Sequence, residues 1–276
     1  MKFFAGVRLL ISALILMGLG FGLQACSGGG GGGTTTPTDA NPTGYYDNTG
    51  TVTVDDDGVG GGSTAISDLQ AMINGNRFMM ISDAQGLIYD GTITNITTND
   101  FAANVSIFKH GQPITNPNAT ISGTITEKSK ITGTLIGTGA GNSNGTFTLQ
   151  YALNNNQAAD LSRIIRTGTI LQWRSDIGGA GNTTRFQIDA TGTIGGPTSA
   201  GNGFFVGCNI GTGSFTPIAG TSLYNVTMNV TNCTNNTADL TYVGLAASWT
   251  SGSTDNQLAI GVTDANTTYS INGDFF

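Results

Sequence analysis

Turn-forming residues recur about every ten residues from residue 44 onward, and this spacing limits the possible folds more than any other feature of the chain. Between the turns, apolar and polar residues alternate, or apolar residues form short runs. Alternation with period two is typical of a strand with one buried face. Strands at this spacing are typical of antiparallel sandwiches and barrels. The sequence therefore predicts an all-β fold.

The first half of this β body contains the clearest hairpin, in the segment DLQAMI-NGN-RFMMIS. We expect Asn74 and Gly75 to supply the left-handed backbone that a tight turn requires. The arm before the turn could instead form a short helix, because its apolar residues between Ile66 and Ile73 also fit one helical face. With the remaining alternating segments, about eight strands are expected, enough to close a small barrel: 49–54, 86–96, 101–109, 119–127, 129–137 and 145–153.

The pattern changes at residues 154–166, where a polar link is followed by a short stretch with apolar residues at helical spacing. We expect a short helix there, containing Ala158, Leu161, Ile164 and Ile165. Strand-like segments then resume, at 168–173, 183–196, 201–211, 222–233, 238–250, 256–264 and 267–276. The prediction is two tandem small antiparallel barrels or sandwiches of lipocalin-like size, β-domain 1 at 44–155 and β-domain 2 at 156–276, with about eight strands each.

The two halves share a short pattern. An Arg-Phe pair in a strand is followed by an Asp-containing turn and a strand opened by Gly, at Arg77 to Gly86 and again at Arg185 to Gly192. Two explanations fit this pattern: a duplication of one unit, or the similarity that all turn-rich β chains share. The sequence leaves both open.

Charged residues make up only 10% of the chain, against about 25% in an ordinary soluble domain. The net charge is −7, and it becomes −9 if residues 1–25 are removed, since that segment carries Lys2 and Arg8 but no acidic residue. The remaining cations are scattered, whereas phosphate binding needs a clustered basic surface. Nucleic acid is therefore not an expected partner.

Residues 1–25 have the order of an export signal. Lys2 and Arg8 form a positive segment, LLISALILMGLGFG is an apolar run, and small residues follow. The apolar run is too short for a spanning helix, which needs about 20 apolar residues. We interpret this segment as a cleaved signal peptide.

The four residues Leu23, Gln24, Ala25 and Cys26 resemble the bacterial lipobox. Membership of that family would imply a diacylglyceryl group on the Cys26 sulfur, cleavage before Cys26, and acylation of the new amino terminus, for example with palmitate. Several acyl chains hold a protein on a membrane without a transmembrane helix, since each buried CH₂ contributes about 0.8 kcal/mol. Ser27 follows the cysteine, and in this family a residue other than Asp there favours the outer membrane.

Residues 26–43 contain no apolar residue able to join a core, so we expect the lipidated cysteine to be followed by a flexible tether. A cysteine followed by a glycine run is similar to the amino termini of some surface lipoproteins. The expected location is the outer membrane, and surface-exposed and periplasm-facing positions both stay open.

The carboxyl-terminal half resembles a set of uncharacterised proteobacterial envelope lipoproteins of all-β fold. The motifs are FFVGCNIGTG, LYNVTMNVTNC and TYVGLAA, and the insertion GPTSAGNG departs from the pattern. The resemblance implies a β fold and an envelope location, and it implies no activity.

Two cysteines remain once Cys26 carries lipid, and an even number in an exported protein predicts a disulfide between Cys208 and Cys233. A redox pair or a metal site is disfavoured, because the chain has no C-x-x-C motif and no histidine near either cysteine.

Groups for catalysis are sparse. His110 is the only histidine, and beside Gly and Pro it is expected to be an exposed loop residue. Glu127 is the only Glu, and the DDDG segment that begins at Asp55 lacks the alternating spacing of a calcium loop. We therefore expect no enzyme activity, no cofactor and no metal.

The expected function is a non-catalytic binding or structural role on the membrane, with a protein, a glycan or a small apolar ligand as partner. The alternatives are an envelope hydrolase that uses paired Asp carboxylates and a surface adhesin. Six aromatic residues could line a binding site or belong to the core: Trp173, Trp249, Tyr45, Tyr46, Phe204 and Phe205.

Overall fold

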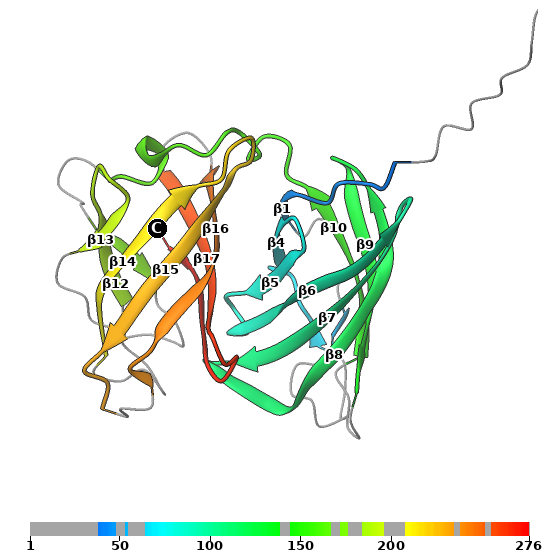
Figure 1. The fold of residues 1–276 in the computed structure, drawn as a ribbon, viewed down its shortest axis with the longest axis horizontal. Helices are drawn as coiled ribbons and strands as arrows, with labels where there is room; N and C mark the ends of the chain where they lie inside the picture. Colours follow the sequence, from blue (N-terminus) through cyan, green and yellow to red (C-terminus); the bar gives the residue numbers. More distant parts are fainter. Residues whose placement is uncertain are drawn as a thin grey trace, which may run out of the picture. The chain divides into compact units, whose positions relative to one another are not determined.

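The structure is a computed structural model, and its described residues all lie within Pro37–Phe276. The described residues are 38–47, 53–54, 64–138, 144–166, 172–175, 184–195, 208–234, 238–251 and 255–275. They form two curved antiparallel sheets that lie side by side (Figure 1).

The first sheet contains ten strands: β1 (Gly44–Asp47), β2 (Thr53–Val54), β3 (Thr64–Ala65), β4 (Gln70–Asn74), β5 (Arg77–Ser82), β6 (Leu87–Thr97), β7 (Asp100–Lys109), β8 (Gln112–Thr126), β9 (Lys130–Gly137) and β10 (Asn144–Tyr151). Strand β1 pairs with β4 on one side and with β10 on the other. These pairings close eight of the strands into a barrel, and β2 and β3 extend the sheet beyond β10.

Alternation in the sequence accounts for the barrel interior. In β9, Ile131 and Leu135 are buried, while Lys130 before them and Thr134 between them are exposed. Gly133 also faces inward, and a Cβ atom there would lie 2.3 Å from the ring of Phe147. The glycine therefore provides the space that this phenylalanine fills in the core.

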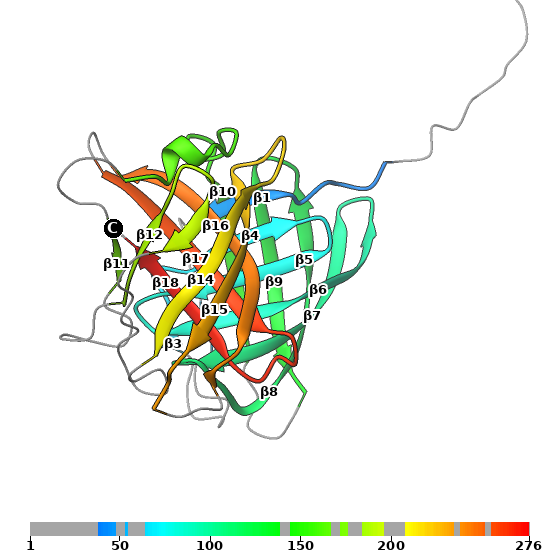
Figure 2. The same ribbon diagram turned by 60° about the vertical axis from the view of Figure 1, so that its left-hand side comes forward.

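The second sheet contains eight strands in chain order: β11 (Trp173–Ser175), β12 (Thr184–Ile188), β13 (Thr193–Gly195), β14 (Asn209–Pro217), β15 (Leu223–Thr231), β16 (Thr241–Ser251), β17 (Asp255–Asp264) and β18 (Ser270–Phe275). The sheet curls around a second apolar core (Figure 2). Its ends come close enough for the rings of Phe186 in β12 and Phe275 in β18 to lie 5.0 Å apart, centroid to centroid. The predicted all-β class with two tandem barrel-like domains is confirmed.

A third apolar cluster, which we call the seam, joins the two sheets. In β5, Phe78 and Met80 point into the barrel, whereas Met79 and Ile81 point outward into the seam. On the other side of the seam, the second sheet contributes residues of β15, β16 and β17. The backbone of β17 lies close to the side chains of β5. A Cβ atom on Gly261 would lie 2.8 Å from the Met79 sulfur. Buried apolar surface therefore holds the two sheets together as one body.

Two local predictions are corrected: the residues of the hairpin turn, and the helix in the link between the two sheets. The hairpin turn consists of Gly75 and Asn76, because Asn74 is still within β4 and pairs with Arg77. Of the two residues expected to be left-handed, Gly75 has a positive φ, +56°, and Asn74 does not. The open alternative of a helix before this turn is resolved in favour of strand β4.

The expected helix in the link is a single 3-10 turn, η1 (Leu161–Arg163). Asp160 caps it by accepting a hydrogen bond from the Ser162 N–H at 2.7 Å. The apolar residue Ile164 is buried in the second core, and its carbonyl accepts a hydrogen bond from the Trp173 ring. One turn is enough to bury Ile164, so the apolar spacing does not produce a longer helix.

The repeated sequence pattern has a structural counterpart. Gly86 and Gly192 both have a positive φ and both donate to the carbonyl of the Asp three residues earlier, at 3.0 and 2.9 Å. The carbonyl of Gly86 accepts a hydrogen bond from the His110 N–H, in the turn after β7. The carbonyl of Gly192 accepts one from the Phe215 N–H, in β14. The β5–β6 and β12–β13 connections are therefore built alike.

Candidate functional site

The predicted lipidation residues, Cys26 and the lipobox residues Leu23, Gln24 and Ala25, lie outside the described residues, as do Asp55, Phe204 and Phe205. Among the described residues, no helix is long and apolar enough to cross a membrane. The predicted disulfide is present between Cys208 and Cys233. It joins the residue before β14 to a residue just after β15, so it fastens one end of this hairpin.

The remaining sequence candidates divide into core and surface residues. Tyr46 and Trp173 are fully buried in the first and second cores. His110 is exposed in the turn between β7 and β8, as predicted. Glu127 accepts a hydrogen bond from the Asn41 N–H at 3.4 Å, which gives it a structural contact. Tyr45 and Trp249 differ from these residues, because they pack on the seam and line a cavity.

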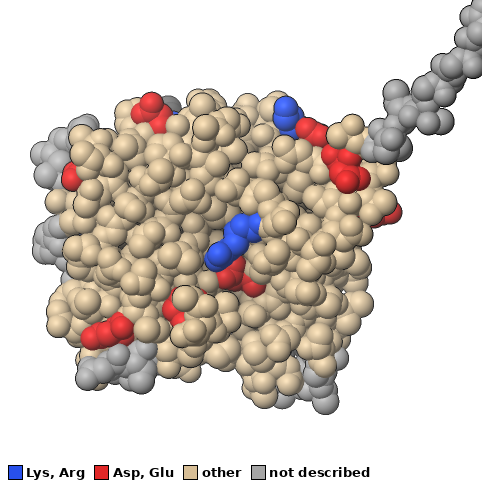
Figure 3. All heavy atoms as spheres, viewed as in Figure 1, with Lys and Arg blue, Asp and Glu red and all other residues tan. Residues whose placement is uncertain are grey.

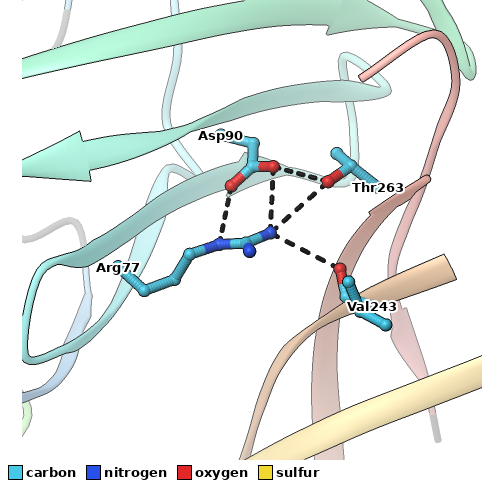
Figure 4. A network of polar contacts seen from close by, with 4 residues as sticks. All are labelled: Arg77, Asp90, Val243 and Thr263. Atoms are coloured by element: carbon cyan, nitrogen blue, oxygen red, sulfur yellow. Dashed lines mark hydrogen bonds and ion pairs between the residues drawn. The ribbon is translucent and has the colours of Figure 1, made fainter. Parts of the chain in front are cut away.

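A charged pair lies where the two sheets meet (Figure 4). Arg77 Nε and Asp90 Oδ1 are 2.9 Å apart, and Arg77 Nη2 donates to Asp90 Oδ2, also at 2.9 Å. Thr263 of β17 donates its hydroxyl proton to Asp90 Oδ2. Arg77 also reaches the Val243 carbonyl of β16 at 3.4 Å. The pair therefore connects the outer face of the barrel to the second sheet.

Burial governs the electrostatics of this pair. Asp90 is only 6% exposed, whereas Arg77 is 33% exposed. Burial raises the pKa of Asp90, and the Arg77 charge and the hydrogen bonds from Thr263 and Arg77 partly offset this effect. Removing one partner from such a pair leaves a buried charge without compensation.

The pair forms part of a groove of about 430 Å³ on the outer face of the barrel. Its uncharged polar lining residues come from β6 to β8, from the residue after β9 and from the turn between β17 and β18: Thr92, Asn104, Ser106, Asn118, Thr120, Thr138 and Thr267. The face of the molecule drawn in Figure 3 carries few charged side chains. The groove therefore offers hydroxyl and amide groups, each able to donate and to accept hydrogen bonds, beside a single ion pair.

A second cavity, of about 220 Å³, lies at the seam and combines aromatic and acidic groups. The rings of Tyr45 and Trp249 stack with centroids 5.7 Å apart and planes 15° from parallel. Five polar residues complete the lining: Asp47, Ser67, Asp68, Gln70 and Asn155. We call this cavity the aromatic pocket.

A hydrogen-bonded chain runs from the aromatic pocket to Asp274, an acid of β18 that is only partly exposed. The Tyr45 hydroxyl donates to Gln70 Oε1 at 2.7 Å, and Gln70 Nε2 donates to Asp274 Oδ2 at 2.7 Å. Burial and the nearby charges of Asp83 and Asp68 raise the pKa of Asp274 to about 7. Asp274 Oδ1 is buried and has no hydrogen-bond partner among the described residues. Negative charge at this location is therefore only partly compensated.

No local pattern in the sequence indicates that these groups come together. Asp90 and Thr263 are 173 residues apart, and Gln70 and Asp274 are 204 residues apart. Within the described part of the chain, no group of three or more His, Cys, Asp or Glu is placed to hold a metal ion.

The chain matches no protein-family model and no curated protein. Its resemblance to envelope lipoproteins therefore rests on the sequence motifs alone, and functional inference rests on the site geometry.

Proposed function

We propose that this chain is a lipid-anchored lipoprotein of the bacterial outer membrane with a non-catalytic role, and that its two-barrel body binds a neutral, hydroxyl-rich partner such as a glycan. The lipobox and the signal-like segment before Cys26 support the anchor. Acyl chains on Cys26 would keep an otherwise water-soluble body at the membrane.

The observation that carries the binding role is the polar groove beside Arg77 and Asp90. The cores inside both sheets consist of buried apolar side chains, which favours a partner on the outside over a small apolar ligand within. Sugar hydroxyls donate and accept hydrogen bonds, and so do the Asn, Ser and Thr side chains of the groove. The low density of charge on this face also favours a neutral partner.

Binding is tested by applying the full chain, in non-ionic detergent, to an array of bacterial cell-wall and surface oligosaccharides. Thr120→Val removes a hydroxyl from the groove, and Thr126→Val makes the same change at another exposed position of β8 that is outside the groove. We expect wild type and Thr126→Val to retain the same glycan and Thr120→Val to lose affinity. Equal binding by all three proteins would place recognition elsewhere.

Location is tested by membrane fractionation of cells that express wild type or Cys26→Ser, followed by protease treatment of intact cells. The wild type should remain with outer membranes, and the serine variant should not. Digestion of the body in intact cells would indicate display at the surface, and protection would indicate a periplasmic partner.

A second candidate, an envelope hydrolase, is favoured by one observation: Asp47 and Asp68 line the same aromatic pocket. Glycosidases use two carboxyl groups, one of them protonated. Asp68, however, accepts hydrogen bonds from Ser82 and from the Ala84 N–H, at 2.6 and 2.7 Å, which gives it a structural role. Release of chromophore from aryl glycosides by wild type, abolished in Asp47→Asn, would establish this alternative.

A further inference from the structure

The aromatic pocket differs in chemistry from the polar groove, because it places ring faces next to carboxylates. Trp249 comes from β16 of the second sheet and is only partly buried, so its indole lines the opening. Tyr45 comes from β1 and is 2% exposed, so it supports the indole from within. The seam fixes both strands, and it therefore fixes the position of the stacked pair.

The two acidic residues of the pocket come from separate segments, and a third acid lies behind them. Asp47 lies at the end of β1, and Asp68 precedes β4. Asp68 accepts two hydrogen bonds from protein groups, and a carboxylate has about four acceptor sites, so it retains capacity for a ligand. Behind them, Gln70 contacts Asp274, whose Oδ1 is buried without a donor in the described part of the chain.

Charge favours a cation over a neutral ligand. The charges that raise the pKa of Asp274, beyond the effect of burial, are those of Asp83 and Asp68. Burial raises the pKa of Tyr45, and the charges of Asp274 and Asp47 raise it further. Every one of these groups is acidic, so the local potential is negative. A positive group beside the indole would gain both carboxylate and cation–π attraction.

Volume limits the ligand. A water molecule occupies about 30 Å³ of liquid, so a cavity of about 220 Å³ holds a group of about seven non-hydrogen atoms. An alkyl chain of four or five carbons that ends in an ammonium group meets this limit, whether it belongs to a free amine or to a lysine side chain.

We propose that the aromatic pocket binds an alkylammonium group, with N–H donors directed at Asp47 and Asp68 and methylene groups packed on Trp249. This inference goes beyond the proposed glycan-binding function and concerns a different surface. The two can therefore fail independently.

The test is calorimetric titration of the full chain, in non-ionic detergent, with pentane-1,5-diamine and with its neutral isostere pentane-1,5-diol. We expect the diamine to bind at least tenfold more tightly than the diol, and more weakly as salt is added. Nα-acetyl-lysine methylamide distinguishes the source: equal or tighter binding than the diamine would indicate a protein lysine, and weaker binding a free amine.

Variants locate the site. Asp47→Asn should weaken diamine binding about tenfold, since it removes a hydrogen bond between charged groups. Trp249→Phe should weaken it about threefold, because a phenyl ring attracts a cation less strongly than an indole does. Asp100→Asn makes the same change of charge at an exposed residue outside the pocket and should have no effect.

Folding is monitored by circular dichroism, and Trp249→Phe keeps the test decisive if Asp47→Asn does not fold. Three results would overturn the inference. These are equal binding of the diol and the diamine, diamine binding that is unchanged in the pocket variants, or no diamine binding at concentrations up to about 10 mM.

Discussion

Asp274 makes the stability of this protein depend on pH. Its pKa is raised from 3.8 to about 7, first by burial and then by Asp83 and Asp68. The folded protein therefore holds this proton more tightly than the unfolded chain does. The contribution to stability is complete below about pH 4 and is lost as the pH rises toward 7, which is opposite to the behaviour of a salt-bridged aspartate.

The magnitude follows from the two pKa values. The rise in pKa from 3.8 to about 7 corresponds to a loss of at most about 4 kcal/mol in the free energy of unfolding. About 2.5 kcal/mol of this loss falls between pH 5 and pH 8. The Asp274 side chain is partly exposed, so solvent screening reduces these figures, and we expect a loss of about 1 to 2 kcal/mol over this interval.

The perturbation is Asp274→Asn, which keeps an oxygen to accept the Gln70 hydrogen bond and has no proton to lose. Urea unfolding of both proteins at pH 5, 6, 7 and 8 measures the free energy of unfolding. The asparagine variant should be the more stable protein at pH 8, with the advantage shrinking toward pH 5. Burial also raises the pKa values of Asp47 and Asp90, but both proteins retain these groups, so the difference isolates Asp274.

Asp100→Asn, at an exposed site, is the control and should follow the wild type at every pH. If wild type and Asp274→Asn lose the same stability between pH 5 and pH 8, the raised pKa assigned to Asp274 is wrong.

Three further predictions concern what holds the body together. Arg77→Leu should cost about 3 kcal/mol in urea unfolding because it leaves Asp90 buried and charged, and the double variant with Asp90→Leu should recover most of this; a double variant as unstable as the single one would contradict the reasoning. Gly261→Leu should lower the free energy of unfolding by about 1 to 3 kcal/mol, because the new side chain has no space at the seam; an unchanged melting curve would refute close contact there. Replacing Cys208 and Cys233 with serine should cost roughly 3 kcal/mol by freeing the loop that they close, and unfolding that is insensitive to reductant in the wild type would count against the disulfide.

The sequence predicts those parts of the fold whose cause is local. The alternating residues of β9 specify one buried and one exposed face without reference to any partner, and the strand was found where expected. The 3-10 turn at Leu161 shows the limit of such reasoning. Its apolar spacing fits a helix, but burial of a single isoleucine against the second core decides the local structure.

The seam and the sites depend on contacts that the sequence does not specify. Strand β5 has apolar residues on both faces, which indicates two buried sides but does not name the element on the second side. Tyr45 and Trp249 are candidates as aromatic residues, yet only the packing of the two sheets stacks them and brings carboxylates beside them. Neighbours that are two hundred residues apart cannot be paired by periodicity or by turn chemistry.

Mass spectrometry of the amino-terminal peptide is the decisive measurement for the proposed lipid anchor. The protein is isolated from the membranes of the cell that makes it, without tags near the amino terminus, and digested. We predict a mature chain that begins at Cys26, with a diacylglyceryl group on the sulfur and a fatty acid on the amino group. A first residue other than Cys26, or an unmodified thiol at that position, would contradict the proposed location and with it the proposed role.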